Sequence, residues 1–439
     1  MAHALSITDG TTTFSLSTTN AYLTLYVPTE AQPGETSVTE SVEIMFYGAS
    51  ASAMQTAIQS LQRLLEGIRR RQQWGVGPAV YFQFQPDGDA TTWRSEMLDA
   101  RLEYKEDTLS VFPQAKLPAT LLLQRVPFWE GALTQIPLTN QSASNNTSGI
   151  TVYNHDDSGT NHDNYVQIAA AAVGGSLPAP VKLELTNGTG STQNWKQIWL
   201  ACNAFSDPAN FTHILEMETA YLSGGSTGSN ADSSNSGYVI NTFNSQNAQQ
   251  FTLSAALLQD ALGYDFHMLT RFRSVDNSVY IRPSIMDSSG SYALWVGDEV
   301  QVTTTSDAIV DLGVCPLPPG GYGTAYGAQR LQLAMRAAST SNVHTDFIAF
   351  FPANTFRRLR MLSTTANGVK VTDDGPEGRA YSVASSAETP NIAVSGMPLT
   401  VWPNTLQRIY VLWSYFDLSA SISTTMSVKA WYRPRRASF

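Results

Sequence analysis

Apolar and polar residues alternate along much of the chain, with the period of two that is typical of β-strands with one buried face. The alternation is clear from Thr13 to Val27, stops between Pro28 and Thr39, and resumes from Ser41 to Tyr47. The interrupting segment is polar, contains Pro and Gly, and is long enough to be a functional extension rather than a tight turn. The pattern predicts strands on both sides of one long loop.

The period changes to that of a helix between Ser50 and Arg71. One face of this segment is apolar and the other carries Gln, Arg and Glu, as in a helix that packs one side onto a core. Ser50 or Ser52 can cap its start, and the basic run from Arg69 to Arg71 complements the negative end of its dipole. We interpret the apolar face as packing against a sheet, not as a membrane or cofactor surface. The apolar positions are Met54, Ala57, Ile58, Leu61, Leu64, Leu65 and Ile68.

Beyond residue 130 the pattern predicts short strands separated by turns, and between residues 238 and 355 their regular spacing indicates a jelly-roll sandwich. Ser223 to Gly237 contains a single hydrophobic residue, Ala231, and is expected to be a mobile surface loop. The last part of the chain is expected to hold three more strands, Leu399 to Trp402, Arg408 to Trp413 and Met426 to Trp431.

The expected fold is therefore mainly β, with a helix-flanked β-barrel or sandwich followed by β-sandwich (jelly-roll) domains. The first domain is expected at residues 1–130, with its helix at 50–71. Residues 131–214 would form the first part of a sandwich, residues 215–355 a jelly roll, and residues 356–439 C-terminal strands that could complete the 131–214 sandwich.

The composition favours an exposed structural protein. Charged residues make up 14% of the 439 residues, against about 25% in typical soluble proteins, and Ser, Thr, Asn, Gln and Gly replace them. A net charge of −10 does not fit a nucleic-acid-binding protein, so no specific nucleic acid binding is expected.

The sequence shows no basic and apolar leader at its start and no apolar run long enough for a membrane span. We expect synthesis in the host cytoplasm, no membrane insertion, and an external location reached by assembly into a particle. Cys202 and Cys315 permit one disulfide, and buried free thiols are the commoner alternative.

A search for catalytic or metal-binding groups gives only weak candidates. Gly224 to Gly228 matches the nucleophile-elbow pattern but lacks the strand and helix that this motif needs. Two His and three Asp between Asn154 and Asn164 could gather a metal, but without zinc or EF-hand spacing a polar hairpin is favoured. Glu216 and Glu218 would share a strand face if extended, which does not by itself indicate glycoside hydrolysis. We expect no enzyme, no metal and no cofactor.

Three aromatic residues could contact a carbohydrate. They fall near turns of the predicted jelly roll, where rings can stack on sugar faces, and core packing is the simpler alternative for each. These residues are Tyr280, Tyr292 and Trp295.

The N-terminal pattern resembles the ring-forming domain of distal tail and related minor tail proteins of long-tailed, siphovirus-like bacteriophages. The features that carry this resemblance are the order strand, long loop, strand and Ser-capped helix, then the hairpin around Phe84 to Gly88 and the closing Arg125 to Gly131. The ending Tyr432 to Arg435 resembles the last strand of such proteins. The segment from Leu215 to Phe351 is similar to galactose-binding-like jelly rolls, which often serve as carbohydrate-binding modules.

The resemblance implies a structural virion protein that forms a multi-copy homo-oligomeric ring at the distal tail or tail tip, with tail-tube and tail-tip proteins as partners. The alternatives are an adhesin that attaches to host surface glycan and a polysaccharide-degrading tail enzyme. The expected subunit contacts are Pro28, Glu30, Pro33, Glu35, Arg69, Arg70 and Arg71.

Overall fold

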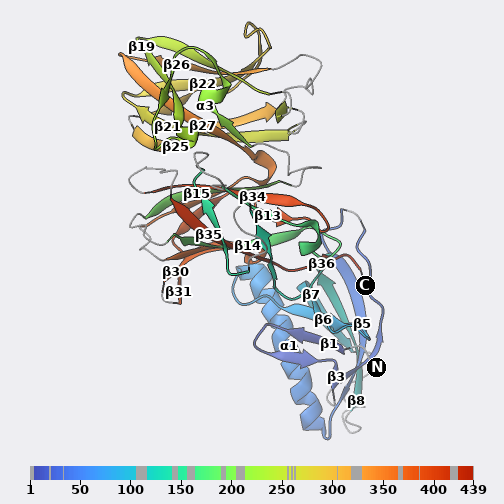
Figure 1. Cartoon of the computed structure of the whole chain (residues 1–439). Helices are drawn as coiled ribbons and strands as arrows, with labels where there is room; N and C mark the ends of the chain where they lie inside the picture. The colour runs from blue at the N-terminus through green and yellow to red at the C-terminus, as the bar shows by residue number, and fades with distance from the viewer. Residues whose placement is uncertain are drawn as a thin grey trace. The chain divides into compact units, whose positions relative to one another are not determined.

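The computed structural model contains two compact units, shown with the course of the chain in Figure 1. The first unit comprises Met1–Thr134, Gly174–Pro178 and Arg433–Phe439, and the second comprises Gln135–Val173 and Ala179–Tyr432. Strands dominate both, which confirms the mainly β class. The structure describes residues 4–18, 21–32, 34–104, 116–140, 147–155, 164–188, 194–203, 213–254, 257–258, 261, 264–303, 305–317, 329–363, 369–384, 386–415 and 424–438.

The first unit is a sheet that closes on itself. Its strand order is β2-β1-β6-β7-β8-β5-β4-β3. Only Leu16 separates β2 from β3, and its N–H donates to the carbonyl of Leu5 at 2.8 Å, so the two ends of the sheet are continuous through the chain. The strands are β1 (Ala4–Thr8), β2 (Thr13–Ser15), β3 (Ser17–Thr18), β4 (Ala21–Tyr26), β5 (Val38–Tyr47), β6 (Tyr81–Gln85), β7 (Trp93–Tyr104) and β8 (Lys116–Arg125).

The predicted helix is confirmed as α1 (Ala51–Trp74), which packs chiefly against β7. Ser50 caps it by accepting a hydrogen bond from the Ala53 N–H at 3.2 Å. The helix ends at Gly75, whose φ of 65° only glycine adopts readily. All seven predicted apolar positions are buried, so this stripe is core.

The end of the chain belongs to the first unit, which corrects the predicted boundaries. Strand β36 (Arg435–Arg436) pairs with β9 (Trp129–Glu130), and Leu177 forms a bridge to Arg435. Arg435 donates to Glu130 at 2.7 Å and lies over the ring of Phe128 at 3.9 Å. Residues 433–439 and 174–178 are therefore not part of the C-terminal and 131–214 sandwich segments, because their pairing partners lie at the end of the first unit.

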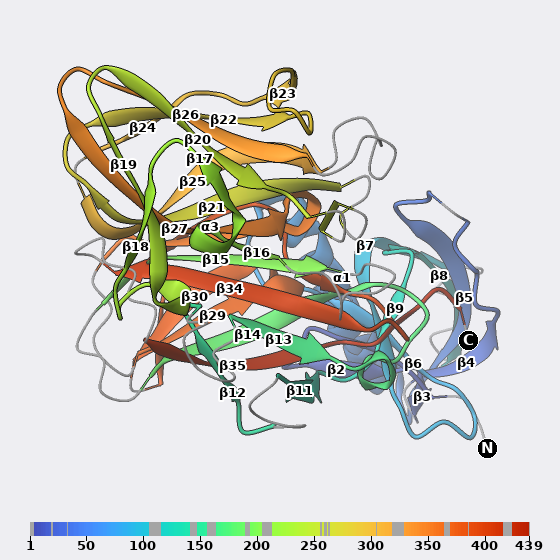
Figure 2. The ribbon, with the colours of Figure 1, turned by 45° about the horizontal axis from the view of Figure 1, so that its top comes forward.

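Two β-sandwiches form the second unit. The first packs the sheet β10-β35-β14-β29-β30-β31 on the sheet β11-β13-β34-β15-β28-β32, with β12 and β33 added to the former. Figure 2 shows β34 running beside β13 and β15. The strands are β10 (Thr134–Ile136), β11 (Leu138–Thr139), β12 (Ile150–Tyr153), β13 (Tyr165–Ile168), β14 (Ala179–Asn187), β15 (Trp195–Asn203), β28 (Arg357–Met361), β29 (Lys370–Asp374), β30 (Arg379–Ala384), β31 (Ala387–Thr389), β32 (Ile392–Ser395), β33 (Thr400–Val401), β34 (Gln407–Tyr415) and β35 (Thr425–Tyr432).

The second sandwich is the jelly roll, with sheets β18-β19-β27-β21-β25 and β17-β20-β26-β22-β23. Strand β16 joins the former sheet and β24 the latter. The elements are β16 (Ile214–Glu216), α3 (Met217–Ala220), β17 (Tyr221–Ser223), β18 (Ser226–Ser229), β19 (Gly237–Phe243), β20 (Gln246–Thr252), β21 (Tyr264–Val275), β22 (Val279–Met286), β23 (Ala293–Val296), β24 (Val300–Val302), β25 (Thr305–Leu317), β26 (Arg330–Ala337) and β27 (Ser341–Pro352). Short 3-10 turns are η2 (Ala170–Ala172), η3 (Ser234–Ser236), η5 (Ala353–Thr355) and η6 (Gly375–Glu377).

The sheet containing β34 is buried on both faces around that strand. Ile409 and Val411 belong to the core of the first sandwich, whereas Tyr410 and Leu412 belong to the jelly-roll core. All nine residues of β34 are buried, as expected for a strand covered on both sides. This sheet therefore joins the two sandwiches into one unit.

The segment from Ser223 to Gly237 is not the mobile loop that its composition predicts. Strand β18 pairs with β19 within it, and Ser233 and Ser234 have no exposed surface. The Ser234 N–H donates to Asp346 at 3.1 Å. The backbone pairing of β18 and the hydrogen bond from Ser234 to the buried Asp346 order a segment whose side chains are small and polar.

The prediction of three C-terminal strands was incomplete, because β28 to β32 lie before them. Both cysteines are free and buried. Among the described helices, none has the length and apolar character needed to cross a membrane.

Candidate functional site

The segment between β4 and β5 is the first predicted contact surface, and we call residues 27–37 the arm. Pro28, Glu30 and Glu35 are exposed on it, and Pro33 lies outside the described residues. Within the arm, Glu35 accepts a hydrogen bond from the Gln32 N–H at 2.8 Å. Pro28, Glu30 and Glu35 are thus placed where another molecule can reach them.

A buried ion pair holds the base of the arm. Glu40 Oε1 accepts hydrogen bonds from Arg125 Nη2 at 2.6 Å and from the Thr29 N–H at 3.0 Å. Arg125 also donates to the Thr29 carbonyl at 3.0 Å, and neither charged side chain has exposed surface. Burial, and then the charge of Glu40, raises the pKa of Tyr26, so its phenol stays protonated and donates to Glu40 at 3.0 Å. The arm therefore leaves the barrel from a rigid point.

The basic run on α1 does not act as one patch. Arg69 lies 3.7 Å from Glu66, one turn earlier on the helix. Arg71 pairs with Glu96 at 3.1 Å and donates to the Gly77 carbonyl. Arg70 is exposed. Two of the three predicted contact residues thus have partners inside the first unit.

Exposed apolar side chains on the first unit were missed at the sequence level. Val27 is 69% exposed at the start of the arm, and Leu25 on β4 is exposed beside it in the sequence. Trp74 is 67% exposed at the end of α1, and Val76 follows it. Exposed apolar groups of this size commonly mark contact surfaces. The alternation did not reveal them, because Leu25 and Val27 have the same parity as the buried Ala21. A register shift between Leu23 and Leu25 turns Tyr26 toward the core in place of Leu25.

The three predicted carbohydrate contacts lie on or beside β22 and β23 of the jelly roll, but they do not form one platform. Tyr280 lies under Arg336, whose guanidinium carbon is 4.1 Å from the ring centroid. Tyr292 is 74% exposed in a turn that Asp287 holds through the Ser291 and Tyr292 N–H groups. Trp295 is partly buried against the hydrophobic core.

A charged groove lies on the same sheet, with a volume of about 460 Å³. Arg336 donates two hydrogen bonds to Glu299, which lower the pKa of that carboxyl group. Arg282 is exposed in the groove. The full lining is Gln246, Asn247, Ala248, Arg282, Glu299, Ala334, Met335 and Arg336.

The weak metal and carboxylate candidates serve structural roles where they are described. Asn154 bonds both the carbonyl and the N–H of Trp413, and His155 lies 2.5 Å from Glu216. Residues 156–163 lie outside the described part of the chain. Glu216 ends β16 while Glu218 lies in α3, so the two carboxylates do not share a strand face. Within the described residues there is no group of three or more ligands that could hold a metal.

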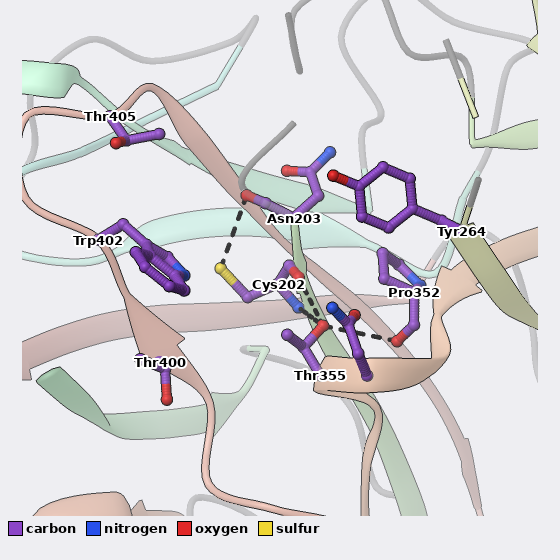
Figure 3. Close-up of a pocket in the computed structure, with 9 residues that line it drawn as sticks. Cys202, Asn203, Tyr264, Pro352, Thr355, Thr400, Trp402 and Thr405 are labelled. Carbon is purple, nitrogen blue, oxygen red and sulfur yellow. Dashed lines mark hydrogen bonds between the residues drawn. The ribbon is translucent and has the colours of Figure 1, made fainter. Parts of the chain in front are cut away.

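A second hollow, of about 310 Å³, was not predicted from the sequence. Figure 3 shows Trp402 and Tyr264 on opposite sides of Cys202 and Asn203. Trp402 follows β33 of the first sandwich, and Tyr264 begins β21 of the jelly roll. We call this hollow the Trp402 pocket. Its lining is Cys202, Asn203, Tyr264, Pro352, Asn354, Thr355, Thr400, Trp402 and Thr405.

The thiol in the Trp402 pocket belongs to Cys202. Complete burial raises the pKa of Cys202 to about 12, so the sulfur stays protonated at neutral pH. Its Sγ lies 3.9 Å from Oε1 of Gln407 and 3.8 Å from the Asn203 carbonyl. The protonated form of this thiol is a poor nucleophile.

Comparison with known proteins gives structural likenesses alone. No family model matches the chain, and no curated protein sequence matches it. The chain is similar to the Dit protein of phage SPP1, described as a paradigm of the hub adsorption apparatus in Gram-positive infecting phages (TM-score 0.29, 8% identity, 99% of each chain covered). It is also similar to a GH26-CBM35 β-(1,4)-mannanase of Podospora anserina (TM-score 0.23, 15% identity), over 32% of this chain and 27% of the mannanase. A third similarity is to TmCBM61 in complex with β-1,4-galactotriose (TM-score 0.18, 10% identity, 34% of this chain and 98% of that one). At these values the likenesses do not decide the function of this chain.

Proposed function

We propose that the chain is a non-enzymatic structural protein of a bacteriophage tail, in which copies of the first unit associate into a ring at the distal tail or tail tip. The proposal rests on the resemblance of residues 1–130 to ring-forming tail domains. The observation that carries it further is the arm, on which Pro28, Glu30 and Glu35 are exposed and whose base is fixed by the buried Glu40–Arg125 pair. A rigidly anchored extension with exposed apolar residues at its start is suited to reach a neighbouring copy.

The self-association can be tested by native mass spectrometry of the full chain at increasing concentration. We expect assemblies of several copies for the wild type. The double variant Leu25→Asp, Val27→Asp should dissociate into monomers, because a carboxylate buried without a partner strongly disfavours the contact. Val296→Asp is the matched control, since Val296 is an exposed valine of β23 in the second unit.

A wild-type chain that stays monomeric at every concentration, and that is missing from the tails of purified particles, would contradict the proposal. Equal dissociation of the control and the double variant would show that the arm is not the contact. A map of intact particles that locates the chain along the tail axis tests the location and the tail-tube and tail-tip partners directly.

The charged groove on β22 favours a second function, attachment to a host surface glycan. Exposed Arg282 and the amide of Gln246 offer hydrogen-bond donors on an open sheet face, whereas the Asn247 amide already donates to Asn241 at 2.7 Å. A glycan array probed with the full chain and with Arg282→Ala would test it, with loss of signal in the variant as the expected result. Release of reducing ends from host-envelope glycans would instead support the degrading enzyme, which we do not expect.

A further inference from the structure

The Trp402 pocket has the size and the uncharged polar lining of a small-ligand site. Its volume of about 310 Å³ lies at the lower end of the range of about 300–1,000 Å³ for ligand pockets. None of its nine lining residues is Asp, Glu, Lys, Arg or His. A charged ligand would lose its hydration there without gaining a partner. The occupant is therefore expected to be neutral.

Trp402 is exposed although tryptophan is usually a buried residue. It is 47% exposed, whereas Trp129, Trp195, Trp199 and Trp413 are at most 2% exposed. Tyr264, on the other side of the pocket, is 39% exposed. Two aromatic rings that flank an open space can receive an apolar face between polar edges.

A buried side chain holds Trp402 in this exposed position. Gln407 has no exposed surface, and its Oε1 accepts from the Trp402 N–H at 3.0 Å while its Nε2 donates to the Trp402 carbonyl at 3.0 Å. The same Nε2 donates to the Thr405 carbonyl at 3.2 Å, and the turn between them includes Asn404 with a φ of 53°. Since the turn is already ordered, a ligand that contacts Trp402 pays little of the usual cost of ordering a loop.

The opposite wall is fixed in a similar way. The Thr355 hydroxyl accepts from the Cys202 N–H at 3.0 Å and donates to the Cys202 carbonyl. This pair of bonds attaches η5 to the end of β15 and places Asn354 at the pocket. Among the described residues, no hydrogen bond is made by the exposed Asn354 amide. The pocket thus offers a donor and an acceptor beside the aromatic rings.

We propose that the Trp402 pocket binds one neutral monosaccharide unit of a glycan. A sugar ring presents a C–H face, which can stack on the Trp402 indole, and a rim of hydroxyl groups, which can bond the Asn354 amide. The site differs from the groove on β22, which contains Arg282, Glu299 and Arg336. Because the two sandwiches both contribute residues, neither of them forms this pocket alone. The inference does not depend on the tail assignment.

Saturation-transfer NMR of the full chain can test the site with the methyl glycosides of glucose, galactose, mannose and N-acetylglucosamine. Glucuronic acid serves as the charged comparison. We expect saturable binding of at least one neutral glycoside, weakened at least tenfold by Trp402→Ala and more mildly by Asn354→Ala. Trp74→Ala is the matched control, because Trp74 is also an exposed tryptophan and lies in the first unit.

The idea fails if none of the four glycosides binds saturably, if Trp402→Ala binds as the wild type does, or if only glucuronic acid binds. Binding lost in Arg282→Ala and kept in Trp402→Ala would assign the sugar to the β22 groove instead. Thermal unfolding of each variant shows whether it is folded. Asn354→Ala is a second, independent test of the site, because the Asn354 side chain lies at the surface and its loss should not unfold the protein. The oligomeric state measured by mass spectrometry stays a separate result, so failure of one proposal does not imply failure of the other.

Discussion

Glu40 and Gln407 show how one buried polar residue can position an exposed segment. Each makes a side-chain hydrogen bond with the backbone of that segment, Glu40 with Thr29 of the arm and Gln407 with Trp402 of the pocket turn. Leaving such a buried group without its partners costs about 1–3 kcal/mol, so the segment is held in one conformation. In the sequence both residues look like ordinary surface polar residues. Their role depends on burial, which the local pattern does not reveal.

His213 gives a pH dependence to the second unit. Complete burial, and then the neighbouring His155 and Arg408, lower the pKa of His213 well below its usual 6.5. The folded state therefore keeps this histidine neutral, whereas the unfolded chain binds a proton below about pH 6.5. Stability from this residue is present above that pH and is lost as pH falls, by up to about 1.4 kcal/mol per pH unit.

Urea unfolding between pH 5 and 7.5 can measure this effect. In the wild type the free energy of unfolding should fall more steeply below pH 6.5 than in His213→Gln. The variant will be less stable overall, because it loses the contacts of the imidazole ring with Asn164 (2.6 Å) and Tyr410 (4.2 Å). Only the slope is diagnostic. Parallel pH curves for the two proteins would show that His213 does not account for the dependence.

Elements with one apolar face were predictable, whereas those built on buried charge were not. Helix α1 shows its full apolar stripe and its Ser50 cap in the sequence. Strands β28 and β29 carry the buried pair Arg357–Asp373, which is joined by two hydrogen bonds of 2.6 Å. In the sequence these charged residues indicate exposed polar segments rather than buried strands. The Trp402 pocket could not be predicted from the sequence for another reason, because Trp402 and Tyr264 lie far apart in the chain. Only the packing of two sandwiches brings them to one hollow.

The variant Leu61→Ala tests how far the stability of the first unit depends on the packing of α1. Its side chain is fully buried in the core of that unit, so Leu61→Ala should lower the free energy of unfolding by about 2–5 kcal/mol. Gln59→Ala is the control on the exposed face of the same helix, and it should change stability by less than about 0.5 kcal/mol. Differential scanning calorimetry of both variants measures the difference. Equal stability would mean that the helix adds little to the core of the unit.

At the scale of the whole molecule, the second unit is inserted into the sequence of the first. The chain leaves the first unit after Thr134, returns for Gly174–Pro178, and returns finally at Arg433. The last strand thus completes a fold whose other strands were made from the first 134 residues. Such a connection is not visible in local periodicity, because β36 is only two residues long. The resemblance of Tyr432 to Arg435 to a last strand indicated a strand here but not its partner, β9 of the first unit.

A chain that ends at Tyr432 should therefore loosen the first unit and leave the second intact. It would lose the acceptors of the Gly131 and Ser176 N–H groups, each bonded at 2.8 Å to the carbonyls of Pro434 and Arg435. We expect faster hydrogen exchange at Gly131 and Ser176 and unchanged protection in β34, because β34 is buried in the second unit. A chain that ends at Arg436 keeps β36 and is the matched control. Unchanged exchange at Gly131, or an equal loss of protection in β34, would mean that the C-terminal strand does not complete the first unit on its own.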